Sequence, residues 1–144
     1  MKEKLKEIEK VISNIEKNTL SQIEELLNKF LKTHLKRSRI NTFIGDYPTF
    51  IEPVYLEENV IIGDDVLLGP NVYIGNNCEL KDYVEISNSI IFDNVIIGEN
   101  IKLDKCILDK NTSLNFKNVN LENCILFGNL ETKEEAYKIM LKFK

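Results

Sequence analysis

The chain has 144 residues, a length typical of one compact domain with an appendage. Its 19 basic and 23 acidic residues give a net charge of -4, which lacks the strongly basic balance of nucleic-acid-binding proteins and favours no anionic membrane surface. No apolar run approaches the roughly 20 residues that span a bilayer, and the chain opens with the charged residues Lys2, Glu3 and Lys4 instead of a signal peptide. We therefore expect a cytoplasmic protein that binds neither nucleic acid nor membrane.

The first segment, residues 1–38, is predicted to be helical. It is rich in Glu, Lys and Leu and contains neither Gly nor Pro between residues 2 and 36. Its apolar residues follow the three-four spacing of one helical face, and this spacing slips near residues 18–20. Ser21 with Glu24 resembles a capping box. The sequence leaves two alternatives open, one bent helix or a hairpin of two helices.

The only histidine and a basic cluster lie at the end of this segment. The negative end of a helix is complemented by His34 and by the cations Lys32, Lys36, Arg37 and Arg39. Phosphate or nucleotide binding is the alternative interpretation of the basic cluster.

Residues 39–49 are predicted to be a connector, because helical periodicity stops there and turn residues follow. These turn residues are Asn41, Gly45, Asp46 and Pro48.

Residues 50–128 contain an internal repeat in which pairs of apolar residues, two positions apart, recur every six residues. The spacing of two places both members on one face of a strand, and the intervening Gly and Asn residues supply corners that reach positive φ cheaply. The repeat predicts a mainly β fold, a left-handed parallel β-helix of about four coils packed inside with aliphatic side chains. The expected inward pairs are Val54/Leu56, Val60/Ile62, Val66/Leu68, Val72/Ile74, Cys78/Leu80, Val84/Ile86, Ile90/Phe92, Val95/Ile97, Ile101/Leu103, Cys106/Leu108, Thr112/Leu114, Val119/Leu121 and Cys124/Leu126.

Irregularities of one residue interrupt the repeat. In the predicted alignment, one residue is missing before Val95, Cys106 and Cys124, and one is added before Val119. Residues 131–143 then form a short amphipathic C-terminal helix. The three cysteines, Cys78, Cys106 and Cys124, are an odd number without a CxxC pair, so we expect reduced thiols and no metal site.

The run PVYLEENVIIGDDVLLGPNVYIG at residues 53–75, with VEISNSII at residues 84–91, resembles the C-terminal β-helix of sugar nucleotidylyltransferases. The similarity is to the glucose-1-phosphate thymidylyltransferase and mannose-1-phosphate guanylyltransferase type, and to the acetyltransferase half of N-acetylglucosamine-1-phosphate uridylyltransferase. The resemblance implies that nucleotidyl transfer resides in a separate α/β domain, which does not precede residue 50 here. We therefore do not expect this chain alone to catalyse it.

Acyl transfer in relatives of this fold uses a histidine as general base, and His34 lies outside the repeat. A carboxylate or tyrosine could take the same role, and Lys81, Asp82, Tyr83 and Glu85 lie together along the chain. These four residues are the candidate catalytic group, and solvated corner residues are the simpler interpretation.

The residue between the members of each inward pair points outward. Taking every third hexad gives an outer column that is apolar throughout, which predicts an interface or a surface covered by the chain's own helices, such as the C-terminal one. The resemblance implies a homotrimer. The column is Tyr55, Tyr73, Ile91, Ile107 and Ile125.

Three functional hypotheses follow from these features. The first is a non-catalytic assembly or regulatory module in nucleotide-sugar metabolism, without a cofactor and with a separate nucleotidyltransferase subunit as partner. The alternative is an acyltransferase that uses acetyl-CoA on a nucleotide sugar or amino-sugar phosphate. A third possibility is that the helical segment recruits a partner while the β-helix provides trimerisation.

Overall fold

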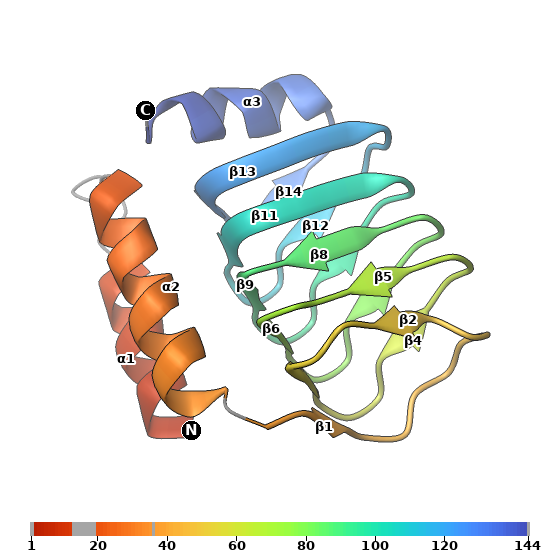
Figure 1. The fold of residues 1–144 in the computed structure, drawn as a ribbon. Coiled ribbons are helices and arrows are strands. Elements are labelled where there is room, and N and C mark those ends of the chain that lie inside the picture. The colour runs from red at the N-terminus through yellow and green to blue at the C-terminus, as the bar shows by residue number, and fades with distance from the viewer. Residues whose placement is uncertain (1, 13–19, 36, 144) are drawn as a thin grey trace.

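The computed structural model describes residues 2–12, 20–35 and 37–143 and shows a parallel β-solenoid of about five turns flanked by helices (Figure 1). Every strand pair given by the register is parallel, as a solenoid requires. The helices are α1 (Lys2–Ile12), α2 (Leu20–His34) and α3 (Lys133–Leu141). The strands are β1 (Arg39–Ile40), β2 (Thr49–Phe50), β3 (Val54–Leu56), β4 (Ile61–Ile62), β5 (Leu67–Leu68), β6 (Val72–Ile74), β7 (Glu79–Leu80), β8 (Glu85–Ser87), β9 (Ser89–Ile91), β10 (Ile96–Ile97), β11 (Ile101–Leu108), β12 (Ser113–Leu114), β13 (Val119–Leu126) and β14 (Asn129–Leu130).

The solenoid has three faces. Face A comprises β1, β3, β6, β9 and the second halves of β11 and β13, whereas face B comprises β4, β7, β10, β12 and β14. Face C comprises β2, β5, β8 and the first halves of β11 and β13. Strands β11 and β13 run without interruption from face C into face A, which joins these two faces into one sheet.

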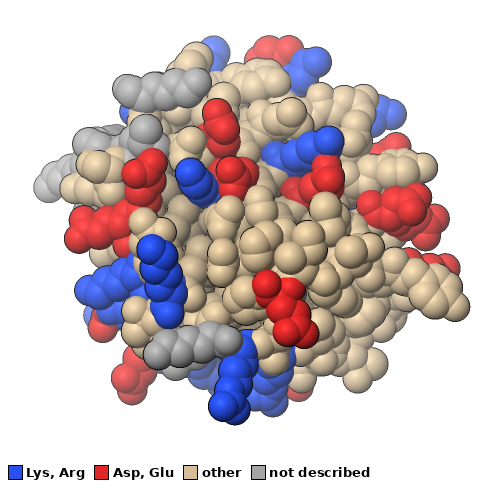
Figure 2. Space-filling model, viewed as in Figure 1, with Lys and Arg blue, Asp and Glu red and all other residues tan. Residues whose placement is uncertain are grey.

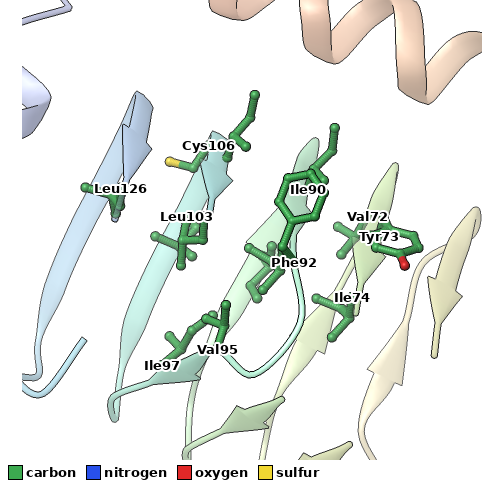
Figure 3. Packing of buried hydrophobic residues seen from close by; sticks show 14 of the residues in the cluster. Val72, Tyr73, Ile74, Ile90, Phe92, Val95, Ile97, Leu103, Cys106 and Leu126 are labelled. Atoms are coloured by element: carbon green, nitrogen blue, oxygen red, sulfur yellow. The ribbon is translucent and has the colours of Figure 1, made fainter. Parts of the chain in front are cut away.

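The interior is the aliphatic ladder that the six-residue repeat predicts. Figure 3 shows the side chains of Val72, Ile74, Val95, Ile97 and Leu103 gathered between the sheets, and each is almost fully buried. Backbone hydrogen bonds link each coil to the next, for example from Glu79 N to Val95 O at 2.9 Å. Burial of each such side chain contributes roughly 1.5–3 kcal/mol before conformational entropy is subtracted.

The predicted alignment is wrong by one residue in β9. Val72 pairs with Ser89 and Ile74 with Ile91, so Ser89 and Ile91 point inward and Ile90 points outward. The missing residue lies at the corner from face C to face A, where residues 87–88 replace the three corner residues 69–71. Three consecutive apolar residues at 90–92 fit either phase, and Ser89 does not look like a core residue in the sequence.

Asparagine supplies most of the left-handed corners. Of the thirteen non-glycine residues described with positive φ, ten are Asn or Asp directly before an inward residue, where their short polar side chains make this conformation accessible. Glycine was expected to do the same, but only Gly69 and Gly128 have positive φ. Gly75 is needed for space instead, because a Cβ there would meet Asp93 of the next coil.

The solenoid begins earlier than predicted. Residues 39–49 were expected to be a connector, but β1 pairs with β3, Ile44 bridges Ile61 and β2 pairs with β5, which forms a first coil. This coil accounts for the difference between about four expected and about five observed turns. Its short strands lack hexad pairs, and the turn residues lie between them. The rings of Phe43 and Phe50 pack edge-on in this coil, with their centroids 5.8 Å apart.

Two helices, α1 and α2, precede the solenoid (Figure 1). The predicted phase slip falls mostly on residues outside the described range, and α2 begins at Leu20, before the Ser21 expected as its cap. Helix α3 packs on β13 at the other end of the solenoid and is capped by the Thr132 hydroxyl, which accepts a hydrogen bond from Glu135 N. In the described part of the chain, no helix is long and apolar enough to cross a membrane.

Candidate functional site

The apolar outer column on face A is covered by the chain's own helix α2. The register aligns Tyr55, Tyr73, Ile90, Ile107 and Ile125, so Ile90 takes the place predicted for Ile91. All of them except the half-buried Tyr55 are at least 97% buried. Of the two predicted alternatives, an interface or cover by the chain's own helices, the structure shows the second. The covering helix is α2 and not the C-terminal helix.

Aromatic contacts fix α2 on this column. The ring of Phe30, which is fully buried, packs edge-on against Tyr73 at 6.0 Å between ring centroids. The hydroxyl of Tyr73 donates to Glu57 Oε2 at 2.9 Å. Burial, reinforced by this carboxylate, raises the pKa of Tyr73 far above its ordinary value. The ring of His34 lies at the end of α2 and not on the solenoid, with its centroid 5.7 Å from that of the Phe30 ring.

The structure does not bring the four candidate catalytic residues together. Lys81 follows β7 on face B and forms an ion pair with Glu79 at 2.7 Å. Glu85 lies on face C and forms an ion pair with Lys102 at 2.9 Å. The corner between these faces separates them, so neighbours in the sequence become residues of different surfaces.

The other two candidates build that corner. The Oδ1 atom of Asp82 accepts a hydrogen bond from Asp64 N at 2.8 Å in the preceding coil. Tyr83 is half exposed and takes a left-handed conformation with φ of 63°. Both residues have structural roles here, since Tyr83 N also donates to Asp64 O at 2.9 Å.

A hollow lies on face C, next to α3. It is a groove of about 490 Å³ on the outer surface of β8, β11 and β13, with Met140 of α3 at its edge. Figure 2 shows both signs of charge interspersed over the face viewed, without a patch of a single sign. The lining side chains with polar groups are Glu85, Ser87, Lys102, Asp104, Asn120 and Glu122.

Most of these polar groups bind one another across coils. Asp104 Oδ1 accepts hydrogen bonds from Ser87 Oγ at 3.1 Å and from Asn88 Nδ2 at 3.0 Å. Glu122 lies in register with Asp104 in the next coil, so two carboxylates stand side by side. The candidate catalytic residues were expected to be neighbours along the chain, whereas Asp104 and Glu122 lie eighteen residues apart and become neighbours only across coils.

The thiols of the solenoid are shielded from solvent. All three are buried, and burial raises the pKa of Cys78 to about 12. Cys106 and Cys124 lie in adjacent coils with their Sγ atoms 3.8 Å apart, and burial also raises the pKa of Cys106. Among the described residues, no group of three or more metal-binding side chains occurs.

Comparison with family models gives a match to the GMPPB C-terminal domain over residues 50–139, which includes the solenoid from its second coil onward and most of α3. Comparisons with curated proteins and with solved structures give no significant match.

Proposed function

Because the chain belongs to the GMPPB C-terminal domain family, the C-terminal solenoid type of sugar nucleotidylyltransferases, we propose that it is a non-catalytic assembly or regulatory module. In this role it acts in the cytoplasm, in nucleotide-sugar metabolism, and associates with a separate nucleotidyltransferase subunit. It needs no cofactor.

One observation carries the proposal: charged side chains on the outer faces form ion pairs or hydrogen bonds with neighbouring residues. Lys81 with Glu79 and Lys102 with Glu85 form ion pairs on the surface, and Asp104 accepts hydrogen bonds from the preceding coil. Groups engaged in this way are already paired with neighbouring residues, although the exposed ion pairs contribute little to stability. A framework that presents surfaces to a partner needs this arrangement, whereas an acid or base needs a group available to substrate.

The proposed assembly is a homotrimer. Since α2 occupies face A, face B remains for contact between chains, and it exposes Ile61 and Ile96 on its outer surface. Light scattering should give a mass three times 16.7 kDa, and Ile61→Lys with Ile96→Lys should reduce it to one chain. A single-chain mass for the unmodified protein at micromolar concentration would reject the trimer.

The partner is tested by affinity purification from the native host followed by mass spectrometry. We expect a sugar nucleotidylyltransferase to be retained in a fixed ratio, and the purified enzyme to form a complex with the recombinant chain. Retention of the enzyme by an unrelated protein of similar charge, or no complex between purified components, would reject the module.

The groove on face C favours acyl transfer as a second candidate function. It is large enough for a small ligand, and the carboxylate of Glu122 could act as a general base for an acceptor amine while acetyl-CoA binds alongside. Incubation with acetyl-CoA and a panel of amino-sugar phosphates tests this candidate. Thiol release above background that is lost in Glu122→Gln would support it, and no release across the panel would reject it.

A further inference from the structure

A crevice lies between α2 and the corner at which face C turns into face A. Its volume is about 280 Å³, and Leu27 and Leu31 of α2 form its apolar part. Two lysines line it from opposite sides, Lys32 of α2 and Lys105 of the solenoid corner. Neither forms an ion pair with a described residue. The other polar side chains that line it are Glu24, Asn28, Asn71 and Asn88.

Lys105 is an exception among the corner residues of this edge. The equivalent positions in three other coils, each directly before the first inward residue of face A, are Asn71, Asn88 and Asn123. All four have left-handed backbones, and Lys105 has φ of 56°. Asparagine reaches this conformation more readily than lysine, so the lysine adds backbone strain.

Lys105 also interrupts a ladder of side-chain amides along this edge. Asn71 Nδ2 donates to Asn88 Oδ1 of the next coil at 3.0 Å, and Asn100 Nδ2 donates to Asn118 Oδ1 at 2.9 Å at another corner. Lysine has no amide to donate in this way to Asn123. The Oδ1 atom of Asn123 is accordingly buried without a hydrogen-bond partner in the described part of the chain.

A lysine at this corner is therefore unfavourable for two independent reasons, backbone strain and an unsatisfied buried oxygen. What it provides is an ammonium group at the crevice, opposite Lys32. We propose that this crevice binds the phosphate group of a small phosphomonoester, such as a sugar phosphate, between Lys32 and Lys105.

The lining matches such a ligand in charge and in size. A phosphomonoester carries close to two negative charges at neutral pH, which attract the two ammonium groups, and the lining keeps a net charge of +1 when the carboxylate of Glu24 is counted. Lysine is a common phosphate ligand. Asn28 adds an amide donor on the α2 side, and the carboxylate of Glu24 can accept hydrogen bonds from ligand hydroxyls. The volume lies just below the roughly 300–1,000 Å³ of pockets for drug-sized molecules, so it suits a sugar phosphate.

Titration calorimetry and amide NMR of the full chain with glucose 1-phosphate test the proposal. We expect saturable binding that weakens between 50 and 200 mM salt, with shift changes centred on residues 27–32 and on Asn71, Asn88 and Lys105. Glucose without phosphate should not bind. Shift changes elsewhere on the chain, or equal binding of glucose, would overturn the proposal.

The decisive variant is Lys105→Asn, because its two effects have opposite signs. It should weaken glucose 1-phosphate binding at least tenfold while raising the Tm of the free protein by about 4 °C or more, since the amide ladder is restored. Lys32→Gln should weaken binding similarly with little change in Tm. The matched controls Lys110→Asn, at an exposed corner residue, and Lys138→Gln, on α3, remove the same charge away from the crevice.

Both controls should bind as the unmodified protein does. Unchanged binding in Lys105→Asn would overturn the phosphate site, and so would equal weakening in all four variants, which would show a general charge effect. A lower Tm in Lys105→Asn would contradict the ladder argument from which the site was inferred.

Discussion

Face A of the solenoid carries two apolar ladders on the same strands, one pointing inward and one outward. In β11, Leu108 points into the solenoid and its neighbour Ile107 points toward α2, and both are fully buried. The inner ladder is enclosed by the coil to which it belongs. The outer ladder is covered by a helix that lies some seventy residues earlier in the chain.

The difference shows which kind of burial a local repeat determines. Inward residues are buried by the geometry of their own coil, so periodicity is enough to identify them. Outward residues are buried only when another segment docks on them, and periodicity identifies the column without identifying its cover. The solenoid should therefore survive the loss of the helices, whereas the docking of the helices should depend on the solenoid.

The largest effect should come from a charge placed on the inner ladder. Leu108→Asp buries an unpaired carboxylate, which costs several kcal/mol, and should prevent folding of the whole chain. The adjacent change Ile107→Asp should instead release α2 while β structure persists, as seen by circular dichroism and by hydrogen exchange confined to residues 20–35. Equal loss of structure in both variants would contradict the distinction between the ladders.

A smaller loss of stability is expected when a methyl group is added to a glycine at a corner. Gly69 has φ of 110°, and a Cβ there would collide with Ile51 O, so Gly69→Ala should lower the free energy of unfolding by about 3 kcal/mol. Gly128 also has positive φ but has open space around it, so Gly128→Ala should cost only about 1 kcal/mol. Urea denaturation measures both, and similar losses would show that crowding between coils is unimportant.

Alkaline pH should weaken the inner ladder through its thiols. Burial raises the pKa of Cys78 to about 12 and that of Cys106 in the same direction, whereas thiols of the unfolded chain ionise from about pH 8.5. The folded chain then retains protons that the unfolded chain releases, so stability is complete below about pH 8 and falls as pH rises. The free energy of unfolding should fall by about 2.5 kcal/mol between pH 8 and pH 9.5.

The control for this titration is Cys78→Ala. This variant should be less stable at pH 8, but its free energy of unfolding should decrease between pH 8 and pH 9.5 by only about half as much as that of the unmodified protein. A flat profile in the unmodified protein over this range would show that the thiols ionise without unfolding.

The smallest effect should come from the outer ion pair of Glu85 and Lys102 on face C. Both side chains are well exposed, so solvent screens the interaction and Lys102→Met should change the free energy of unfolding by less than about 1 kcal/mol. A double-mutant cycle with Glu85→Gln isolates the pair. A coupling energy above about 2 kcal/mol would indicate that surface pairs hold the coils together more strongly than the comparison implies.

The inner ladder and the C-terminal helix could be predicted from the sequence because both depend on local spacing. The phase of β9 could not, since the apolar run at residues 90–92 fits two registers. The hydroxyl of the inward Ser89 is satisfied by hydrogen bonds with Ser87 O and Cys106 N, which the sequence does not reveal. The first coil was missed because its strands pair with later hexads and contain none of their own.

The groove and the crevice were beyond sequence reasoning for a related reason. Asp104 and Glu122 are neighbours only because successive coils place them in register, and Lys105 meets Lys32 only because α2 docks on face A. The separation of Lys81 from Glu85 has the same origin, since a corner turns the chain between them. A candidate site on a solenoid is better sought along a column than along the chain.

The two ends of the solenoid differ in how accessible their strand edges are to an additional strand. Helix α3 closes the last coil, whereas the coil formed by β1, Ile44 and β2 ends in unpaired strand edges beside the exposed side chains of Ile44 and Ile51. A strand that joins these sheets from outside should therefore pair at the amino-terminal edge, since α3 contacts the end strands β13 and β14.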